Sequence, residues 1–355
     1  MVDIAKRFSH NPILHPRDVK PSMDGLVVEC LLNPGAFTFQ GKTYLLLRVA
    51  ERPELKEGYA SALSVDPNEA SGLKVLHFAK DDPAVNLSDP RSIVHEGKTY
   101  LTTLSHLRLA SSEDGIHFTV DEKPTLPGEG HQEAYGIEDC RVTQVGSCYY
   151  LTYTAVGEDG YGVGMISTED WQHFTRHGMI LPPPNKDCTL FTEKIGDKYY
   201  ALHRPTLGSG GLGGNYIWIA ESPDQLHWGN HTCIARSRPD KWDSARVGAG
   251  AAPTRTSEGW LEIYHGATED NRYCLGALLL DLNDPTRVIA RSEDPIMEPT
   301  TDYEINGFFG NVIFTNGVVE NGDTITVYYG ASDLVVCGAT FSIKEILDTL
   351  RQEKL

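Results

Sequence analysis

Short apolar and aromatic segments recur along the chain, each directly after a turn that contains Gly, Asp or Lys. Six of them are GKTYLLLRV (41–49), GKTYLTTLS (97–105), CYYLTYTAV (148–156), DKYYALHRP (197–205), GWLEIYHGA (259–267) and DTITVYYGA (323–331). Aromatic and β-branched runs after tight turns are typical of β-strands. Measured between Tyr44, Tyr100, Tyr150, Tyr200 and Trp260, the segments are 56, 50, 50 and 60 residues apart.

A second pattern follows several of these segments: a strand, then Ser or Thr, an acidic turn and an aromatic residue. It occurs in LRLASSEDGIHF (107–118), GMISTEDWQHF (164–174) and WIAESPDQLHW (218–228). We interpret it as the outer hairpin of a four-stranded sheet, and a period near 50 residues then predicts a β-propeller. Two β-sandwiches in tandem are the alternative. Because PPPNK (182–186) is too short for a linker, we expect one domain over residues 1–355.

Two segments depart from the strand pattern. SIKEILDTLRQEKL (342–355) has apolar residues at helical spacing and a capping box of Ser342 and Glu345, which predicts a short C-terminal helix. TLGSGGLGGNY (206–216) is rich in glycine but lacks both GK[ST] and a helix after it. We therefore expect a loop on the substrate side and no nucleotide-binding loop.

Composition and charge exclude several classes of protein. The 355 residues include 31 basic and 49 acidic side chains, a net charge of −18, which disfavours binding to a nucleic-acid backbone. No run approaches the roughly 18 apolar residues of a membrane helix, and the N-terminus has no apolar signal-peptide core, so we expect a cytoplasmic protein. The seven cysteines form no CxxC pair, so free thiols and no metal site are expected.

Charged residues recur on the segments that a propeller places at its centre, where burial of charge is costly. The positions are Arg48, Asp139, Arg141, Lys186, His203, Arg204, Arg246 and Asp333. Each alone is explained by a solvated strand end or a structural Arg–Asp pair. Their recurrence at equivalent points of successive repeats instead predicts one shared site.

The predicted set has one prominent carboxylate, Asp139, and several cations. Hydrolytic glycosidases use two carboxylates with a water molecule between them. A single acid facing cations suits a different reaction, in which the acid protonates a glycosidic oxygen while a bound oxyanion such as phosphate attacks the sugar. Asp89 of SDPRSI (88–93) mirrors Asp139 of EDCRVT (138–143), but Glu138 beside Asp139 favours Asp139 as the acid.

Several long motifs, in fixed order over roughly residues 30 to 345, resemble glycoside hydrolase family 130. They are GIEDCRVTQVG-x-x-YYLTYTA, NKDCTLFTEKIGDKYYALHRP, WDSARVGAGAAP, GWLEIYHG, LGALLLDLNDP-x-RVIAR and YYGASD. The resemblance implies a five-bladed β-propeller and an inverting enzyme acting on β-mannosides. Most members are phosphorylases that release α-mannose 1-phosphate, and a smaller set are β-1,2-mannosidases. The six candidate hairpins exceed five blades, so either N-terminal strands complete the last blade or one hairpin is a lid.

The resemblance also implies roles for individual residues. Asp139 is the catalytic acid, relaying its proton through the mannose 3-hydroxyl, although Cys140 replaces the usual proline after it. The phosphate-binding residues are Lys186, Arg204 and Arg246, with His203 adjacent. The mannose-binding residues are Asn33, Arg48, Asp333 and Tyr273. Phosphate is then a co-substrate, and no organic cofactor or metal is expected.

The sequence therefore predicts an inverting β-mannoside phosphorylase that binds a β-mannoside oligosaccharide and phosphate. A β-1,2-mannosidase is the first alternative, since Glu193 or Glu262 would act as a base for water if either reached the site. A non-catalytic carbohydrate-binding propeller is the second alternative, and Asp139 argues against it. Acceptor recognition is expected from the loops 119–135 and 206–216. The linkage stays undetermined, and a homo-oligomer is compatible with the sequence.

Overall fold

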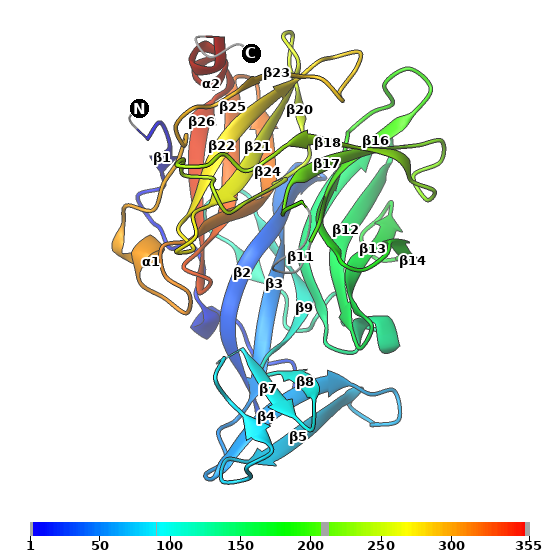
Figure 1. Cartoon of the computed structure of the whole chain (residues 1–355), viewed down its shortest axis with the longest axis vertical. Coiled ribbons are helices and arrows are strands. Elements are labelled where there is room, and N and C mark those ends of the chain that lie inside the picture. Colours follow the sequence, from blue (N-terminus) through cyan, green and yellow to red (C-terminus); the bar gives the residue numbers. More distant parts are fainter. Residues whose placement is uncertain (1–2, 90, 207–212, 352–355) are drawn as a thin grey trace.

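The computed structural model describes residues 3–89, 91–206 and 213–351 of the chain. Nearly all of its regular structure is β-strand, arranged in five large sheets and two small ones (Figure 1). The all-β prediction is therefore confirmed. Residues 207–212 of the predicted glycine-rich loop lie outside the described residues.

Each large sheet is antiparallel, and its strands follow the order of the chain from an inner strand outwards. The first sheet contains β2 (Leu26–Phe39), β3 (Lys42–Pro53), β9 (Leu104–Ser112) and β10 (Thr119–Val120). The second contains β11 (Ile137–Val145), β12 (Cys148–Gly157), β13 (Gly160–Thr168) and β14 (Thr175–Leu181). The third contains β15 (Asn185–Leu190), β16 (Tyr199–Pro205), β17 (Ile217–Ser222) and β18 (Gly229–Ala235).

The fourth sheet has one additional strand, and the fifth sheet takes its fourth strand from the start of the chain. The fourth contains β19 (Arg246–Gly248), β21 (Trp260–Ala267), β22 (Tyr273–Leu280) and β23 (Val288–Arg291), with β20 (Thr254–Arg255) paired to β21. The fifth contains β24 (Ile313–Asn321), β25 (Thr324–Ala331), β26 (Val335–Ser342) and β1 (Lys6–Arg7). A strand from the start of the chain thus completes the last sheet.

Five of the six strand segments predicted from the sequence are the second strands of the five large sheets, namely β3, β12, β16, β21 and β25. The sixth prediction, residues 97–105 as a further repeat, is wrong. After β3 the chain leaves the first sheet, builds two small sheets and returns as β9. Residues 97–105 end one small sheet as β8 (Lys98–Leu101) and begin β9.

The two small sheets project from one end of the molecule, at the bottom of Figure 1. One contains β4 (Tyr59–Val65) and β5 (Leu73–Ala79). The other contains β6 (Val85–Asn86), β7 (Ser92–His95) and β8.

The outer turns of three sheets share one geometry, as the second sequence pattern predicts. The N–H of His117, His173 and His227 each donates to the Oδ1 atom of the aspartate three residues earlier, at 2.8, 2.8 and 2.9 Å. The ring Nδ1 of each histidine lies 2.7 Å from the other oxygen of that aspartate. An Asp turn of this kind reverses the chain and starts the fourth strand.

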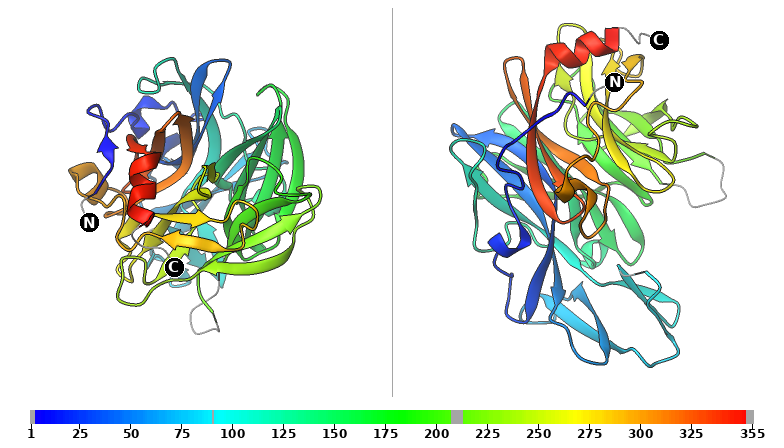
Figure 2. Two further views of the ribbon diagram at one scale, coloured as in Figure 1. Left: turned by 90° about the horizontal axis from the view of Figure 1, so that it is seen from above. Right: turned by 90° about the vertical axis from the view of Figure 1, so that its left-hand side faces the viewer.

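Hydrophobic clusters pack each large sheet against the next. Separate clusters join the first sheet to the second, the second to the third, the third to the fourth and the fourth to the fifth. A fifth cluster joins the last sheet back to the first, through Tyr328 and Val336 against Leu45 and Leu47. The five sheets therefore surround a common centre, as the view from above shows (Figure 2).

The predicted C-terminal helix is confirmed as α2 (Ile343–Arg351), and residues 352–355 lie outside the described residues. Ser342 Oγ accepts the N–H of Glu345 at 3.1 Å, as expected of a cap. Ile346, Leu347 and Leu350 are buried against the last two sheets. The other helical segments are short: α1 (Asp302–Ile305) and two 3-10 turns, Pro16–Asp18 and His131–Glu133. Within the described ranges, none of these helices is long and apolar enough to span a membrane.

Candidate functional site

A cavity of about 500 Å³ lies at the inner strands, where several sheets meet. Of the nine residues with a predicted catalytic or binding role, eight line it: Asn33, Arg48, Asp139, Lys186, Arg204, Arg246, Tyr273 and Asp333. They come from all five large sheets or the turns beside them. The structure therefore brings together residues that are up to 300 positions apart in the sequence.

Interruptions of strand pairing turn side chains of the inner strands towards the cavity. The register shifts between Leu32 and Gly35 in β2, between Glu138 and Arg141 in β11, and between Lys186 and Thr189 in β15. Asp139 and Asp187, inside two of these shifts, have positive φ angles of 49° and 51°. Bulges commonly re-aim side chains beside active sites, and non-glycine residues at positive φ carry a local energetic cost.

Asp139 is buried and held by two donors from the first sheet. Arg48 donates from Nη1 to Oδ1 at 2.9 Å, and Asn33 donates from Nδ2 to the same oxygen at 3.1 Å. Burial acts to raise the pKa of Asp139, but Arg48, Arg141 and Lys186 outweigh it and lower the pKa below its usual value. Without a bound anion, Asp139 is therefore a carboxylate at neutral pH.

The three predicted phosphate-binding cations lie on adjacent sheets. Lys186 and Arg204 are cross-strand partners in the third sheet, and Lys186 Nζ lies 5.1 Å from the centre of the Tyr161 ring. Arg246 begins the fourth sheet, donates to Asn271 Oδ1, and lies 5.4 Å from the centre of the Tyr273 ring. Lysine and arginine side chains that line one cavity can provide charge-assisted hydrogen-bond donors for an oxyanion.

Asp187 orients the arginines behind this cluster. Its Oδ2 accepts from Arg204 Nε at 2.5 Å, and its Oδ1 accepts from Arg141 Nη2 at 3.2 Å. His265 Nε2 lies 3.2 Å from Oδ2. Although burial opposes it, the charges of Arg204 and Arg141 help to hold the pKa of Asp187 well below its usual value. Burial lowers the pKa of His265 to about 4, so that ring is neutral at neutral pH.

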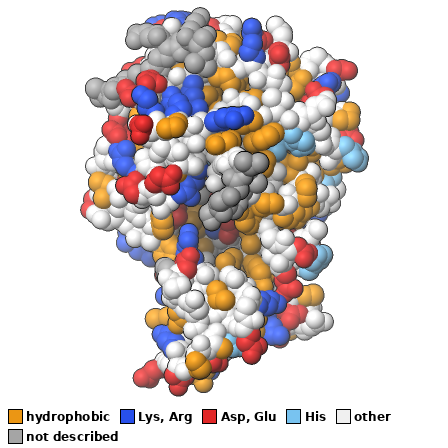
Figure 3. All heavy atoms as spheres, in the orientation of Figure 1, with side chains coloured by type: hydrophobic (Ala, Val, Ile, Leu, Met, Phe, Trp, Pro, Cys, Tyr) orange, Lys and Arg blue, Asp and Glu red, His pale blue; other side chains and the backbone are white. Residues whose placement is uncertain are grey.

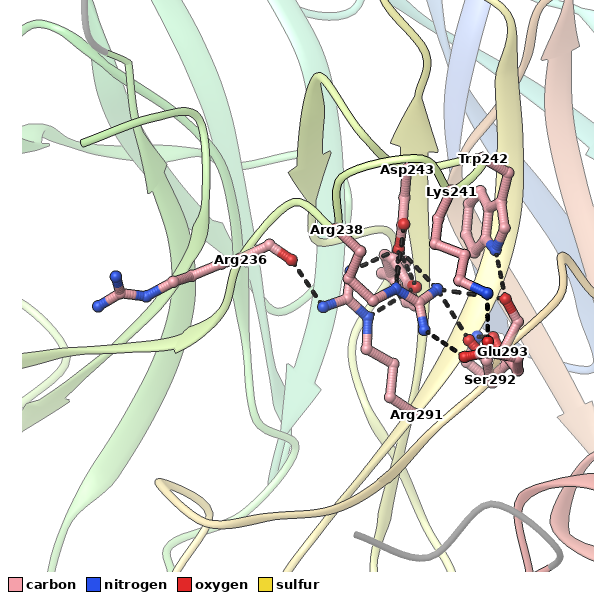
Figure 4. A network of polar contacts seen from close by, with 10 residues as sticks. Arg236, Arg238, Lys241, Trp242, Asp243, Arg291, Ser292 and Glu293 are labelled. Carbon is pink, nitrogen blue, oxygen red and sulfur yellow. Dashed lines mark hydrogen bonds and ion pairs between the residues drawn. The ribbon is translucent and has the colours of Figure 1, made fainter.

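A second network, shown in Figure 4, fixes the segment that leads into Arg246. Asp243 is fully buried and accepts from Arg238 Nη2 at 2.9 Å, from Tyr264 Oη at 2.9 Å and from Arg291 Nη2 at 2.5 Å. Trp242 donates from its indole N–H to the carbonyl of Glu293 at 3.1 Å. These contacts tie residues 238–243 to β21, to β23 and to Glu293 after β23, and Asp243 lies three residues before Arg246.

Three further carboxylates, those of Glu138, Asp333 and Asp89, line the cavity. Burial raises the pKa of Asp333 to about 6, against the opposing charge of Arg48. Asp89, the alternative acid in the sequence analysis, accepts from Arg91 through both oxygens, at 3.0 and 2.8 Å. Its side chain is half-exposed, so Asp89 forms the turn pair that the sequence also allowed.

The prediction that His203 contacts phosphate is not supported by its position, because His203 does not line the cavity. It follows Leu202 and precedes Arg204 on β16, and successive side chains of a strand point to opposite faces. Its Nδ1 lies 3.2 Å from Asn185 Oδ1, and its Nε2 lies 2.9 Å from His231 Nδ1. Burial lowers the pKa of His203 to about 3, so the ring carries no charge at neutral pH.

The two glutamates considered as bases for water do not line the cavity either. Glu193 is half-exposed and lies 2.9 Å from Arg255 Nε. Glu262 is fully buried, and its Oε1 accepts the N–H of Gly250 at 2.7 Å. Burial raises the pKa of Glu262 to about 8.

The sequence analysis missed Asp187, His265 and Asn271 as residues that shape the site. A sequence pattern could have identified Asp187. Both Lys186–Asp187–Cys188 and Glu138–Asp139–Cys140 have an aspartate followed by a cysteine at the start of an inner strand. His265 and Asn271 left none, because their roles depend on contacts with residues distant in the sequence, His265 with Asp187 and Asn271 with Arg246.

A buried carboxylate that shares one cavity with lysine and arginine side chains is chemically suited to transfer of a glycosyl group to an anion. Comparison with known proteins agrees: a family model described as β-1,4-mannooligosaccharide phosphorylase matches residues 82–352. The chain belongs to glycoside hydrolase family 130.

Individual relatives are similar over nearly the whole chain. A β-1,2-mannobiose phosphorylase from Listeria innocua is 46% identical over 351 residues, 98% of each chain. Its solved structure, a complex with β-1,2-mannobiose, aligns with a TM-score of 0.93, covering 98% of this chain and 99% of that one. A 1,2-β-oligomannan phosphorylase from Thermoanaerobacter is 42% identical over 246 residues, 68% of this chain and 80% of that protein.

Proposed function

We propose that this protein is an inverting β-mannoside phosphorylase that cleaves β-1,2-linked manno-oligosaccharides with inorganic phosphate and releases α-mannose 1-phosphate. The observation that carries the proposal is the presence of Lys186, Arg204 and Arg246 in the same cavity as the buried Asp139. The β-1,2 linkage is supported by the names of the relatives at 46% and 42% identity. The retained acid and cations disfavour a non-catalytic binding protein.

In this proposal phosphate binds between Lys186, Arg204 and Arg246, and one of its oxygens attacks C1 of the terminal mannosyl residue. The C1–O glycosidic bond breaks, and the leaving oxygen takes a proton from the mannose 3-hydroxyl, which in turn takes the proton of Asp139 and leaves it as a carboxylate. Asn33, Arg48, Asp333 and Tyr273 hold the mannosyl residue. Attack from the face opposite the leaving group converts the β-mannoside into an α-phosphate. Asp187 is a positioning residue that aims Arg204 at the anion.

Phosphate binding also affects the protonation of Asp139, which is ionised when no anion is bound. Lys186 is among the cations that lower the pKa of Asp139. A bound phosphate offsets that positive charge and adds negative charge nearby, and both effects raise the pKa of a carboxyl group. Binding of the nucleophile therefore favours protonation of the acid.

We further propose that the five large sheets are the blades of a five-bladed β-propeller. The hydrophobic cluster that joins the last sheet to the first supports a closed ring. The pairing of β1 with β26, which combines both ends of the chain in one sheet, supports it too.

Hydrolysis is the second candidate, and the positions of Glu193 and Glu262 outside the cavity disfavour it. The experiment is incubation with β-1,2-mannobiose with and without phosphate, followed by NMR of the products. We expect α-mannose 1-phosphate and free mannose only when phosphate is present. Release of mannose at full rate without phosphate would overturn the phosphorylase.

A further inference from the structure

A second hollow opens beside β9, where the β4–β5 hairpin meets the first large sheet, and we define it as the β9 hollow. Its volume is about 680 Å³, larger than the catalytic cavity and within the usual range for small-molecule sites. It is lined by Leu104 and His106 of β9, Glu51 of β3, residues 65–73 of the hairpin, and the segments 22–23 and 123–130. Among the described residues, none lines both hollows. Figure 3 shows that the molecule narrows where the small sheets join the large ones, which is the junction that the β9 hollow occupies.

Two buried polar side chains, Glu51 and His106, line the β9 hollow, and each is only 3% exposed. Glu51 Oε1 accepts the N–H of Ser22 at 2.6 Å, and its Oε2 accepts the hydroxyl of Ser22. His106 Nε2 lies 3.2 Å from Arg108 Nη2 and 3.9 Å from Glu51 Oε2. A carboxylate and an imidazole ring therefore lie close together in the wall of the hollow.

The ring of His106 has one hydrogen-bond donor without an acceptor. Because a guanidinium group can only donate, His106 Nε2 accepts from Arg108. Burial and the charge of Arg108 lower the pKa of His106 to about 3, so the ring is neutral at neutral pH and carries its proton on Nδ1. Nδ1 is buried and has no hydrogen-bond partner within the part of the chain that the structure describes. Since buried polar groups are almost always hydrogen-bonded, this N–H indicates that an acceptor occupies the hollow.

The rest of the wall shows which kind of molecule supplies that acceptor. Its two other charged residues, Lys123 and Glu129, are exposed to solvent. Most of the remaining side chains are apolar, namely Met23, Val65, Pro67, Leu73, Leu104, Pro124 and Pro127. Such a wall is typical of small-molecule sites, in which a few polar groups orient an otherwise apolar ligand.

The pair of Glu51 and His106 selects a neutral hydroxyl group. The carboxylate of Glu51 repels an anion, and the N–H of His106 cannot accept a hydrogen bond from a cationic group. A hydroxyl oxygen accepts from His106 Nδ1, and the hydroxyl group donates to a carboxylate oxygen of Glu51, which has lone pairs beyond those bonded to Ser22. A sugar carries a hydroxyl group on nearly every carbon, more than these two side chains satisfy. The wall therefore favours a largely apolar molecule that bears one hydroxyl group.

The β9 hollow lies behind the strand that holds Arg48. Ser105 is between Leu104 and His106 on β9, so its side chain points to the opposite face of the strand. Its hydroxyl accepts from Arg48 Nε at 3.0 Å, and Arg48 also donates to Asp139. A ligand against Leu104 and His106 therefore touches the strand that orients Arg48.

We propose that the β9 hollow is a regulatory site for a neutral, largely apolar small molecule that bears a hydroxyl group, and that its occupancy changes the affinity of the catalytic cavity for the mannoside. The hydroxyl group binds between His106 and Glu51, and the apolar body packs on Leu104 and Val65. The effect on the mannoside rests on the proposed function, because it takes Arg48 as a mannose-binding residue. Binding of the small molecule itself does not depend on that function.

The first test is calorimetric titration of the wild type with 4-methylphenol, and with toluene, which lacks the hydroxyl group. We expect 4-methylphenol to bind and toluene to bind about tenfold more weakly, because the hydrogen bonds of the hydroxyl group are lost. His106→Phe removes the donor at similar size, and Val65→Trp fills the hollow without changing its polar groups. Each is expected to raise the Kd for 4-methylphenol about tenfold. Val75→Trp is the matched control for Val65→Trp, because Val75 is 39% exposed on β5 and lies outside the hollow.

The second test measures the Kd of Asp139→Asn for β-1,2-mannobiose with and without saturating 4-methylphenol. We expect a change of about fivefold, and by linkage the same factor in the Kd for 4-methylphenol when mannobiose is bound. No binding of 4-methylphenol, equal binding in both hollow variants and the wild type, or an unchanged Kd for mannobiose would overturn the proposal.

Dissociation of an oligomer in Val65→Trp but not in Val75→Trp, seen by size-exclusion chromatography, would overturn it as well, since a second copy would then fill the hollow. Failure of the proposed function gives a different result. Binding of 4-methylphenol that His106→Phe abolishes, without any binding of mannobiose, would contradict the proposed function and support the ligand site in the β9 hollow.

Discussion

Arg48 donates to Asp139 Oδ1 at 2.9 Å through Nη1, and its Nη2 lies 2.7 Å from Glu138 Oε1. One guanidinium thus joins the acid to a second carboxylate and helps to keep the acid ionised. The lowered pKa of Asp139 means that, in the protein alone, its proton is already lost at neutral pH. A general acid in this state depends on a ligand that changes its surroundings.

Phosphate binding is therefore expected to be coupled to uptake of a proton by Asp139. Calorimetric titration with phosphate near pH 5.5, in two buffers of different ionisation enthalpy, measures the number of protons taken up. We expect the wild type to take up more than Asp139→Asn, because the variant lacks the group whose pKa rises. Equal uptake by the two proteins would show that the proton comes from elsewhere.

Asp139→Asn is expected to lower the rate of mannobiose phosphorolysis by about 10²–10⁴-fold, the usual contribution of a positioned general acid. The amide side chain of Asn has nearly the same shape as the carboxyl group but is too weakly acidic to act as a general acid. Asp224→Asn is the control, since Asp224 lies in an exposed outer turn of the third sheet. Near-wild-type cleavage by Asp139→Asn would contradict the assignment.

Lys186→Met is expected to raise KM for phosphate about tenfold or more, because a hydrogen bond to a charged group contributes roughly 1.5–3 kcal/mol. Lys198→Met is the matched control, since Lys198 is in the same sheet but pairs with Glu221 at its surface. His203→Asn provides a contrast, because His203 lies outside the cavity. A rise in KM for phosphate in His203→Asn as large as in Lys186→Met would contradict our placement of the anion.

Much of the fold was predictable because its signals are local. Tight turns before aromatic runs identified the second strand of every large sheet, and the Asp turns identified the outer hairpins. The two small sheets, which the chain forms between β3 and β9, were not predicted. Residues 97–105 carry the same local signal as the true repeats, and only their pairing with β7 and the small sheets separates them.

The sequence predicted which strands contribute to the candidate site, but it predicted less well which side chains of those strands point into the cavity. His203 and Arg204 are neighbours on β16, and their alternation sends only Arg204 to the cavity. Bulges at Asp139 and Asp187 interrupt the alternation of side chains in β11 and β15. Alternation along the sequence therefore does not predict which residues of these strands face the cavity. The partners of Asp187 come from three sheets, and this long-range contact has no local pattern.

Glu262→Gln distinguishes a buried structural acid from a catalytic base. With a pKa of about 8 in the folded protein and 4.5 as its ordinary value, Glu262 stays protonated on folding while the unfolded chain loses the proton. Its burial therefore costs increasing stability as pH rises from about 4.5 to 8. We expect Glu262→Gln to keep phosphorolysis and to raise Tm more at pH 8 than at pH 5. Loss of all cleavage at unchanged stability would instead identify a base.

The network of Figure 4 predicts a residue that acts on phosphate through Arg246 without touching it. Asp243→Asn removes a buried charge that holds Arg238 and Arg291, so stability is expected to fall by about 3 kcal/mol. Because the segment before Arg246 loosens, KM for phosphate should rise several-fold while KM for mannobiose changes little.

Glu304→Gln is the matched control for that variant. Glu304 is also fully buried, and it accepts from Arg7 Nε at 2.8 Å and from Tyr329 Oη at 2.8 Å in the fifth sheet. Its loss is expected to lower Tm to a similar extent with no selective effect on phosphate, because its side-chain partners Arg7 and Tyr329 belong to the fifth sheet and not to the segment that leads into Arg246. Steady-state kinetics with each substrate varied in turn, at a temperature where both variants are folded, measures the difference. An equal effect of Asp243→Asn and Glu304→Gln on KM for phosphate would mean that Asp243 stabilises the fold without positioning the cation.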